Sequence, residues 1–231
     1  MKIEIWSDFA CPFCYIGKKR FESALQQFKY KDSVEVIYKS YQLNPNAPKT
    51  LIGSAYEQFS KRHQLTIEQV KQRFGLISES AKTVGLTFDY DHMQMTNTRD
   101  AHRLQKYAQT IGKGVIMTEH LMKAYFTDGK NLSDTQTLLE LSEALGLDGQ
   151  TVELVLCSNQ FEDAVKEDIQ EAKDIGVQGV PFFVINRAYG VSGAQDSGYF
   201  LQMLNQIYHE EQKQQFHTSH APLCEGDYCE R

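Results

Sequence analysis

Two cysteines near the N-terminus, Cys11 and Cys14, form a Cys-Pro-Phe-Cys motif. If the first cysteine begins a helix, the unpaired N–H groups and the helix dipole there stabilise its thiolate. A second cysteine one turn later can attack the mixed disulfide that the first one forms. The spacing therefore predicts Cys11 as the nucleophile and Cys14 as the resolving thiol of a disulfide exchange. The same spacing also occurs in half of a zinc site, or could be incidental.

The residues on either side of the motif predict a strand before it and a helix after it. Residues 3–7 include apolar, β-compatible side chains, and apolar residues recur with a helical period from Pro12 to about Phe28. Pro12 suits a first helical position, where its missing N–H leaves no hydrogen bond unmade. Residues 34–43 then predict a second strand that Asn44-Pro45 ends. The chain is expected to open as β-α-β with the cysteines at the strand–helix junction.

The middle of the chain, from about 54 to 175, has helical periodicity and no convincing strand. A cap residue and a glycine mark one of its helices, because Ser133 suits an N-cap and Gly146 a C-cap. Candidate helices cover 54–63, 66–84, 97–111, 115–126, 134–145 and 150–174, the last divided near Asn159.

Strand character returns at 180–185 and 189–192, and a helix is expected from about Ser197 to Glu211. Proline cannot donate to a sheet ladder, so Gly179-Val180-Pro181 ahead of an apolar strand indicates a special bend, with a cis bond as one explanation and an ordinary trans proline as the other. The predicted order is therefore β-α-β, a helical block, then β-β-α.

Composition narrows the class of protein. The chain has 231 residues, 41% hydrophobic and 23% charged, with a net charge of -6, which argues against nucleic acid or an anionic membrane as the main partner. No apolar run approaches the ~20 residues of a membrane helix, and the N-terminus lacks the pattern of a secretory signal. A cytoplasmic location is expected, in which the five cysteines are unlikely to be structural staples.

Two stretches together resemble the DsbA-like branch of the thioredoxin superfamily. They are residues 7–17, Ser-Asp-Phe-Ala-Cys-Pro-Phe-Cys-Tyr-Ile-Gly, and residues 176–186, Gly-Val-Gln-Gly-Val-Pro-Phe-Phe-Val-Ile-Asn. Shorter stretches at 41–45, 97–103 and 192–195 are similar to the FrnE-like subgroup of disulfide oxidoreductases.

This resemblance implies an α/β fold of the thioredoxin type, split between 1–45 and 176–211, with a large helical domain inserted at 46–175. It also implies a cis Pro181 facing Cys11, with the Val180 backbone pairing with an extended substrate. Pro12 and Phe13 would shape the dipeptide between the cysteines and contact substrate. No cofactor is required, and glutathione stays open as a reductant or co-substrate.

The last residues, 212–231, are polar and are predicted to be a tail with a second pair, Cys224 and Cys229. Three interpretations stay open: an accessory dithiol that exchanges electrons with the main motif, as some FrnE-like proteins imply, a metal cluster with His217 and His220, or an inert tail. About 13 residues separate Glu211 from Cys224, which allows a reach of up to ~43 Å.

Three further residues could support the site or the core. Cys157 follows apolar residues on a predicted helix and is expected to be buried. His102 is either a structural histidine or, by the resemblance, a residue lining the site. Asp8 either tunes the pKa of a buried cysteine or is an exposed loop carboxylate.

The sequence thus predicts a thiol–disulfide oxidoreductase that acts on protein or small-molecule disulfides through Cys11 and Cys14. A glutathione-dependent transferase or isomerase of the kappa-class or hydroxychromene-carboxylate type is the alternative, although those proteins generally carry serine where Cys11 stands. A non-catalytic, metal-responsive adaptor is a third hypothesis. No nucleic acid, membrane or bound metal is expected, and a homodimer is left open.

Overall fold

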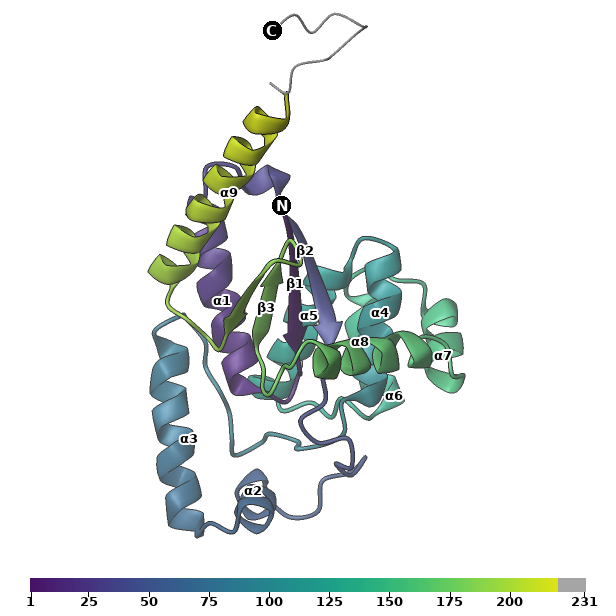
Figure 1. Ribbon diagram of the computed structural model, residues 1–231. Coiled ribbons are helices and arrows are strands. Elements are labelled where there is room, and N and C mark those ends of the chain that lie inside the picture. Colours follow the sequence, from purple (N-terminus) through teal and green to yellow (C-terminus); the bar gives the residue numbers. More distant parts are fainter. Residues whose placement is uncertain (220–231) are drawn as a thin grey trace, which may run out of the picture.

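The computed structural model describes residues 1–219, with side chains in the last helix as far as residue 213. The chain folds into a small sheet flanked by helices, with a helical block beside it (Figure 1). The first part holds β1 (Lys2–Ser7), α1 (Pro12–Gln27), a short 3₁₀ turn (Lys31–Ser33) and β2 (Glu35–Ser40). The helical block holds α2 (Ala55–His63), α3 (Ile67–Lys82), α4 (Arg99–Thr110), α5 (Gly114–Phe126), α6 (Thr135–Glu143), α7 (Gly149–Cys157) and α8 (Glu162–Asp174). The chain continues with β3 (Phe182–Ile185), β4 (Tyr189–Ser192) and α9 (Ser197–Ser219).

The sheet has the strand order β2-β1-β3-β4. β1 pairs in parallel with β2, with Ile3 opposite Val36, and antiparallel with β3, with Ile3 opposite Ile185. β3 and β4 form an antiparallel pair. The central strand β1 therefore joins the two ends of the chain, and the predicted order of β-α-β, helical block and β-β-α is confirmed.

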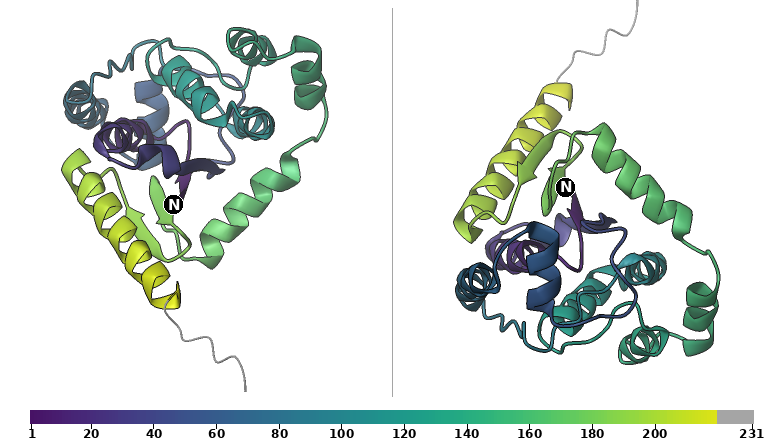
Figure 2. Two further views of the ribbon diagram at one scale, coloured as in Figure 1. Left: turned by 90° about the horizontal axis from the view of Figure 1, so that it is seen from above. Right: turned by 90° about the horizontal axis from the view of Figure 1, so that it is seen from below.

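Alternate residues of β1 face different layers, as the two-residue period of a strand requires. Ile3 and Ile5 join the core beneath α1 and α9, whereas Trp6 packs on the opposite face with Ala172 of α8. The Trp6 indole N–H also donates to the Asp168 carbonyl at 2.8 Å. Figure 2 shows α9 and α8 on different sides of the sheet. The strand that leads to the cysteines is thus held on both faces.

The helical block differs from the prediction at one cap and agrees with it at one boundary. Asp134, not Ser133, is the N-cap of α6, because its carboxylate accepts from the Thr137 N–H at 2.8 Å. The Ser133 hydroxyl instead donates to the Asn97 carbonyl at 2.6 Å. The predicted division near residue 159 is confirmed, since α7 ends at Cys157 and α8 begins at Glu162.

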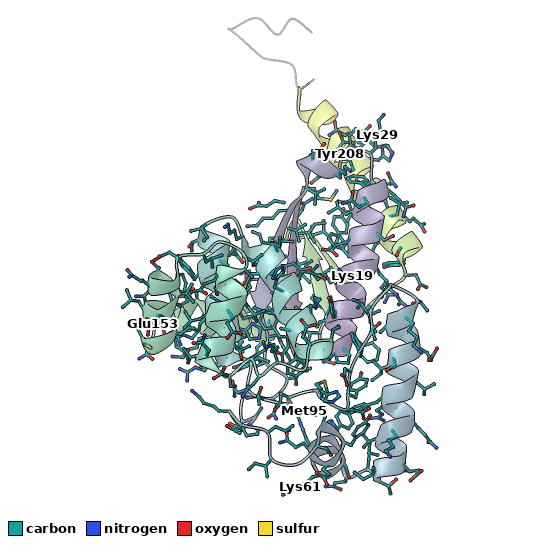
Figure 3. The ribbon with its side chains drawn as sticks, turned by 180° about the vertical axis from the view of Figure 1, so that it is seen from behind. Lys19, Lys29, Lys61, Met95, Glu153 and Tyr208 are labelled. Carbon is teal, nitrogen blue, oxygen red and sulfur yellow. The ribbon has the colours of Figure 1, made fainter. Side chains whose placement is uncertain are left out.

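Helix α9 runs beside α1 and points away from Cys11. Near its start, Arg20 of α1 donates to the Ala194 carbonyl at 2.7 Å, and further along Tyr208 stacks on Tyr30 with ring centroids 3.9 Å apart. Figure 3 shows Tyr208 beside Lys29, at the opposite end of the molecule from Lys61. The helix continues to Ser219, beyond the predicted end at Glu211, and at 1.5 Å per residue it is about 34 Å long.

Within the part of the chain that is described, no helix is long and apolar enough to cross a membrane.

Candidate functional site

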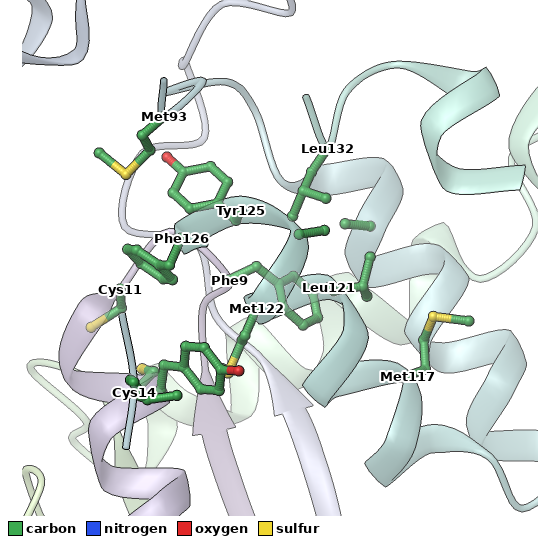
Figure 4. Close-up of a cluster of buried hydrophobic side chains, with 14 of the residues drawn as sticks. Phe9, Cys11, Cys14, Met93, Met117, Leu121, Met122, Tyr125, Phe126 and Leu132 are labelled. Atoms are coloured by element: carbon green, nitrogen blue, oxygen red, sulfur yellow. The ribbon is translucent and has the colours of Figure 1, made fainter. Parts of the chain in front are cut away.

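The two cysteines lie at the junction of β1 and α1. Cys11 is the N-cap residue of α1 in an extended conformation, and Pro12 is the first helical residue. The Cys14 N–H donates to the Cys11 carbonyl at 3.0 Å, so the second cysteine sits one turn into the helix. Both are free thiols and almost fully buried, 4% and 2% exposed. Figure 4 shows the pair at the margin of the buried cluster that contains Phe126 and Met122.

The segment before β3 closes over Cys11. The Val180–Pro181 peptide bond is cis, and the Cys11 thiol donates to the Val180 carbonyl with 3.4 Å between sulfur and oxygen. Gly17 allows this approach, because a Cβ at that position would lie only 3.0 Å from Pro181 Cγ. The N–H of Val180 has no partner among the described residues, which leaves a backbone donor beside the Cys11 sulfur.

The Cys14 thiol is held in its protonated form. Burial raises the pKa of Cys14 well above its usual value, and the neighbouring Cys11 sulfur raises it further. The Ser7 hydroxyl and the Asp8 backbone lower this pKa, but they do not offset the burial. Cys14 therefore needs a base or a change of surroundings before it can become a thiolate.

Asp8 is a buried carboxylate, only 1% exposed, so its alternative interpretation as an exposed loop residue is wrong. One oxygen accepts from the Thr98 hydroxyl at 2.8 Å and lies 3.3 Å from Nε2 of His102, and the other accepts from the Leu43 N–H at 2.8 Å. The His102 ring packs against Phe9 with centroids 4.5 Å apart. This network ties the loop before Cys11 to α4 and to the segment after β2.

A second polar cluster joins α1 to α5. The fully buried Lys18 pairs with Glu119 of α5 and with Glu22, and Tyr15 donates to Glu119 at 2.8 Å. Burial alone raises the pKa of Glu119, but Lys18, Lys19 and Tyr15 together lower it to about 2. The helix that carries both cysteines is thus fixed to the helical block by a charged contact as well as by apolar packing.

A cleft of about 1070 Å³ opens beside Cys11, and α2 and α3 lie beyond the N-terminal end of α1 (Figure 1). Its lining has a floor and a wall. The floor consists of Asp8, Ala10, Cys11, Pro12, Phe13, Gly179 and Val180. The α2–α3 wall consists of Glu57, Gln58, Phe59, Lys61, Arg62, His63, Arg73, Leu76 and Ile77.

The predicted site residues fall into three groups. Cys11, Pro12, Phe13, Val180 and Asp8 line the cleft. Cys14 is buried one turn after Cys11, and Pro181 follows Val180 through the cis bond. His102 supports the floor through Asp8. Cys224 and Cys229 lie outside the described residues.

The prediction for Cys157 is wrong, because this cysteine is exposed at the end of α7. In the part of the chain that is described, no group of three or more His, Cys, Asp and Glu side chains could hold a metal ion.

Sequence reasoning missed Thr98, Glu119 and the cations of the α2–α3 wall. Thr98 falls in a stretch that the resemblance had singled out, but nothing in that stretch showed that its hydroxyl meets Asp8. Glu119 lies 101 residues from Lys18 along the chain, and no local pattern links them. Lys61 and Arg62 carry no local signal of a site, and only the fold places them in the lining of the same cleft as Cys11.

Comparisons with known proteins agree with this arrangement. The family model described as a DSBA-like thioredoxin domain matches residues 2–205. A probable DsbA oxidoreductase from Streptomyces coelicolor is 35% identical, with a TM-score of 0.85, over 98% of this chain and 94% of that one.

Two more distant structures share the fold alone. A 2-hydroxychromene-2-carboxylate isomerase is 18% identical, with a TM-score of 0.66, over 94% of this chain and 99% of that one. The cytosolic disulfide reductase DsbM from Pseudomonas aeruginosa, solved with GSH, is 15% identical, with a TM-score of 0.63, over 93% of this chain and all of that one.

The FrnE-like subgroup stays a prediction, because the comparisons do not reach that level of detail. The match to the family model covers the sheet, both cysteines, the Val180–Pro181 segment and the whole helical block. The chain belongs to the DSBA-like thioredoxin domain family.

Proposed function

We propose that this protein is a thiol–disulfide oxidoreductase that works by dithiol–disulfide exchange through Cys11 and Cys14. The observation that carries the proposal is the position of the Cys11 sulfur, at the start of α1 and 3.4 Å from the Val180 carbonyl oxygen. An open cleft beside it gives a disulfide room to approach. A helix start favours a thiolate at that place.

The exchange balances without a cofactor. The Cys11 thiolate attacks one sulfur of a substrate disulfide, forms a mixed disulfide and releases the other sulfur as a thiolate, which takes up a proton. Cys14 then loses its proton and attacks the Cys11 sulfur, which breaks the mixed disulfide and frees the second substrate thiol. Two electrons pass from the dithiol to the substrate, and the reverse sequence oxidises a substrate dithiol.

The Val180–Pro181 segment and the dipeptide between the cysteines would hold the substrate. The free N–H of Val180 offers a strand-like hydrogen bond to an extended chain that lies along the floor. Phe13 is 47% exposed and lines the cleft, so it offers an apolar contact next to the reacting sulfur. Pro12 fixes the first turn of α1 and with it the direction of that contact.

The test is thiol-dependent reduction of a protein disulfide by the purified protein. We expect Cys11→Ser to abolish the activity and Cys14→Ser to accumulate the mixed disulfide, which intact-mass measurement detects. Cys157→Ser is the matched control, because it also removes one thiol but lies far along the chain on α7. Retention of activity by the Cys11→Ser variant would exclude the assignment.

A glutathione-dependent transferase or isomerase is a second candidate, favoured by the fold shared with the hydroxychromene-carboxylate isomerase. It predicts saturable binding of glutathione and turnover of an electrophile or isomerisable substrate that survives Cys14→Ser. Loss of all turnover in that variant would instead favour dithiol chemistry. As with the disulfide reductase DsbM, a cytosolic setting would keep both cysteines reduced and is our proposed location.

Cys224 and Cys229 are proposed as an accessory dithiol. Cys224 follows Ser219, the end of α9, by five positions, which span at most about 18 Å. That is well short of the length of α9, which is about 34 Å and leads away from Cys11. We therefore expect Cys224 to exchange with Cys11 of a second copy.

An exchange between copies has a rate that rises in proportion to protein concentration. Disulfide transfer to the tail, followed by quenching and peptide mapping at several concentrations, measures this dependence. A rate that is independent of concentration would show transfer within one chain and require α9 to unwind.

A further inference from the structure

The α2–α3 wall carries positive charge that no carboxylate of the described structure neutralises. Lys61, Arg62 and Arg73 line the cleft, and in the described part of the chain none of the three forms an ion pair. Arg62 donates to the Leu43 carbonyl at 2.7 Å, which fixes its position and leaves its charge uncompensated. Arg62 and Arg73 also add to burial in lowering the pKa of His63, so the positive field of the wall reaches its neighbours.

Neither of the two carboxylates of the cleft forms an ion pair with these cations. Asp8 is bound by Thr98 and by the Leu43 N–H in the floor. Glu57 accepts from the Ser54 N–H at 2.8 Å as part of the capping box of α2. A molecule bound in the cleft therefore contacts cations that form no ion pair within the described structure, and it contacts carboxylates that already accept hydrogen bonds from the protein.

Apolar side chains lie in the same cleft and face solvent. Phe13, Leu43, Ile52 and Leu76 are all exposed, the last by 75%, and they come from four separate segments of the chain. Apolar residues gathered around one opening indicate a surface that binds another molecule. The cleft is larger than one small thiol needs, because it runs from Cys11 to Leu76 on α3.

We infer that the α2–α3 wall binds an extended polypeptide segment of the substrate in which acidic and apolar residues flank the reactive cysteine. This preference rests on the proposed exchange at Cys11, and it concerns the class of disulfide that the protein reduces fastest. Acidic side chains would pair with Lys61 and Arg73, and apolar ones would lie on Leu76 and Phe13. The complementary charge speeds the encounter and selects partners.

The test uses two synthetic peptides, each with one cysteine in a mixed disulfide with an aromatic thiol that absorbs light when released. Leu and Phe flank the cysteine in both, and three further positions are Glu in one peptide and Lys in the other. The reduced protein attacks the peptide sulfur and releases the aromatic thiol, after which Cys14 frees the peptide thiol. We expect the wild type to react about tenfold faster with the acidic peptide at low salt, and salt to reduce this ratio.

Charge-reversal variants locate the selectivity. In the double variant Lys61→Glu/Arg73→Glu, the rate with the acidic peptide divided by the rate with the basic peptide should fall to one or below. Because both rates come from the same variant, a change in the reactivity of the Cys11 sulfur cancels in this ratio. Lys82→Glu is the matched control, since Lys82 is also on α3 but pairs with Glu79 in solvent and lies outside the cleft. It should retain the wild-type ratio.

Each result has a distinct meaning. A wild-type ratio of one, or an equal loss in the Lys82→Glu variant, would overturn the inference and leave the exchange function standing. A glutathione mixed disulfide that outpaces the acidic peptide and is the substrate affected by the double variant would replace the polypeptide by a small anionic thiol. Absence of reaction with a neutral mercaptoethanol mixed disulfide would instead contradict the proposed function itself.

Discussion

The floor of the cleft holds its polar groups in hydrogen-bonded sets, whereas the α2–α3 wall presents cations with no carboxylate partner in the described structure. Asp8 of the floor is buried and accepts hydrogen bonds from two different segments. Leu76 of the wall is exposed, and Arg73 beside it on the same helix is unpaired in that part of the chain. In the proposed exchange, the hydrogen-bonded floor would set the reactivity of Cys11, and the open wall would set the choice of partner.

A matched pair of leucine truncations tests this difference most strongly. Leu121 of α5 is fully buried and Leu76 is 75% exposed. We expect Leu121→Ala to lower the free energy of unfolding by about 3 kcal/mol, because it removes apolar contacts and leaves a cavity. The same change at Leu76 should alter it by less than about 0.5 kcal/mol. Urea titration measures both, and equal losses would mean that the wall is part of the core.

The pH dependence of stability tests the anchor beneath the floor. Glu119 has a folded pKa of about 2, below its unfolded value, so its contribution is complete above about pH 4.5 and is lost as the pH falls toward 2. Glu119→Gln should reduce stability at pH 7 by about 2 kcal/mol and flatten the decline between pH 5 and 2.

The midpoint of urea unfolding, measured for the wild type and for Glu119→Gln at several pH values in this range, gives the contribution of Glu119. Glu153→Gln, an exposed glutamate on α7, controls for the loss of one carboxylate. If the Glu119→Gln curve kept the wild-type slope, the ion pairs with Lys18 and Lys19 would not be what stabilises α1.

The rate of alkylation compares the buried thiol of Cys14, next to the floor, with the exposed thiol of Cys157. Burial raises the pKa of Cys14 and shields its sulfur, so iodoacetamide should modify it at least about tenfold more slowly than the exposed Cys157 at pH 7.5. Peptide mass spectrometry of the reduced protein gives both rates. Urea should bring them together, and equal rates in the folded protein would show that the floor opens readily.

Much of the sheet and the motif could be predicted, because both depend on local patterns. The strand–cysteine–helix junction follows from alternating apolar residues, from Pro12 and from the helical period after it. Asp8 could not be placed in the same way, since its partners Leu43, Thr98 and His102 lie 35 to 94 residues away. Long-range contacts of this kind are set by packing and leave no signal near the residue itself.

Two of the errors had a usable signal in the sequence. On a helix with 3.6 residues per turn, Cys157 projects almost opposite to the buried Val152 and Val155, so its exposure follows from the phase of α7. Residues 212–219 are polar except for Phe216, but they contain neither Gly nor Pro, and the helix continues through them. Polarity alone thus indicates exposure, and it does not indicate the end of a helix.

The pairing of β1 with β3 has a consequence for the synthesis of this chain. Ile3 of β1 pairs with Ile185 of β3, so β1 cannot form this antiparallel pairing until the ribosome has made more than 180 residues. At the usual 5–20 residues per second this takes about 10–40 s, during which β1 has an unpaired edge beside β2. Such an edge is prone to pairing with other chains. The nascent protein should therefore depend on chaperones until residue 185 has left the ribosome.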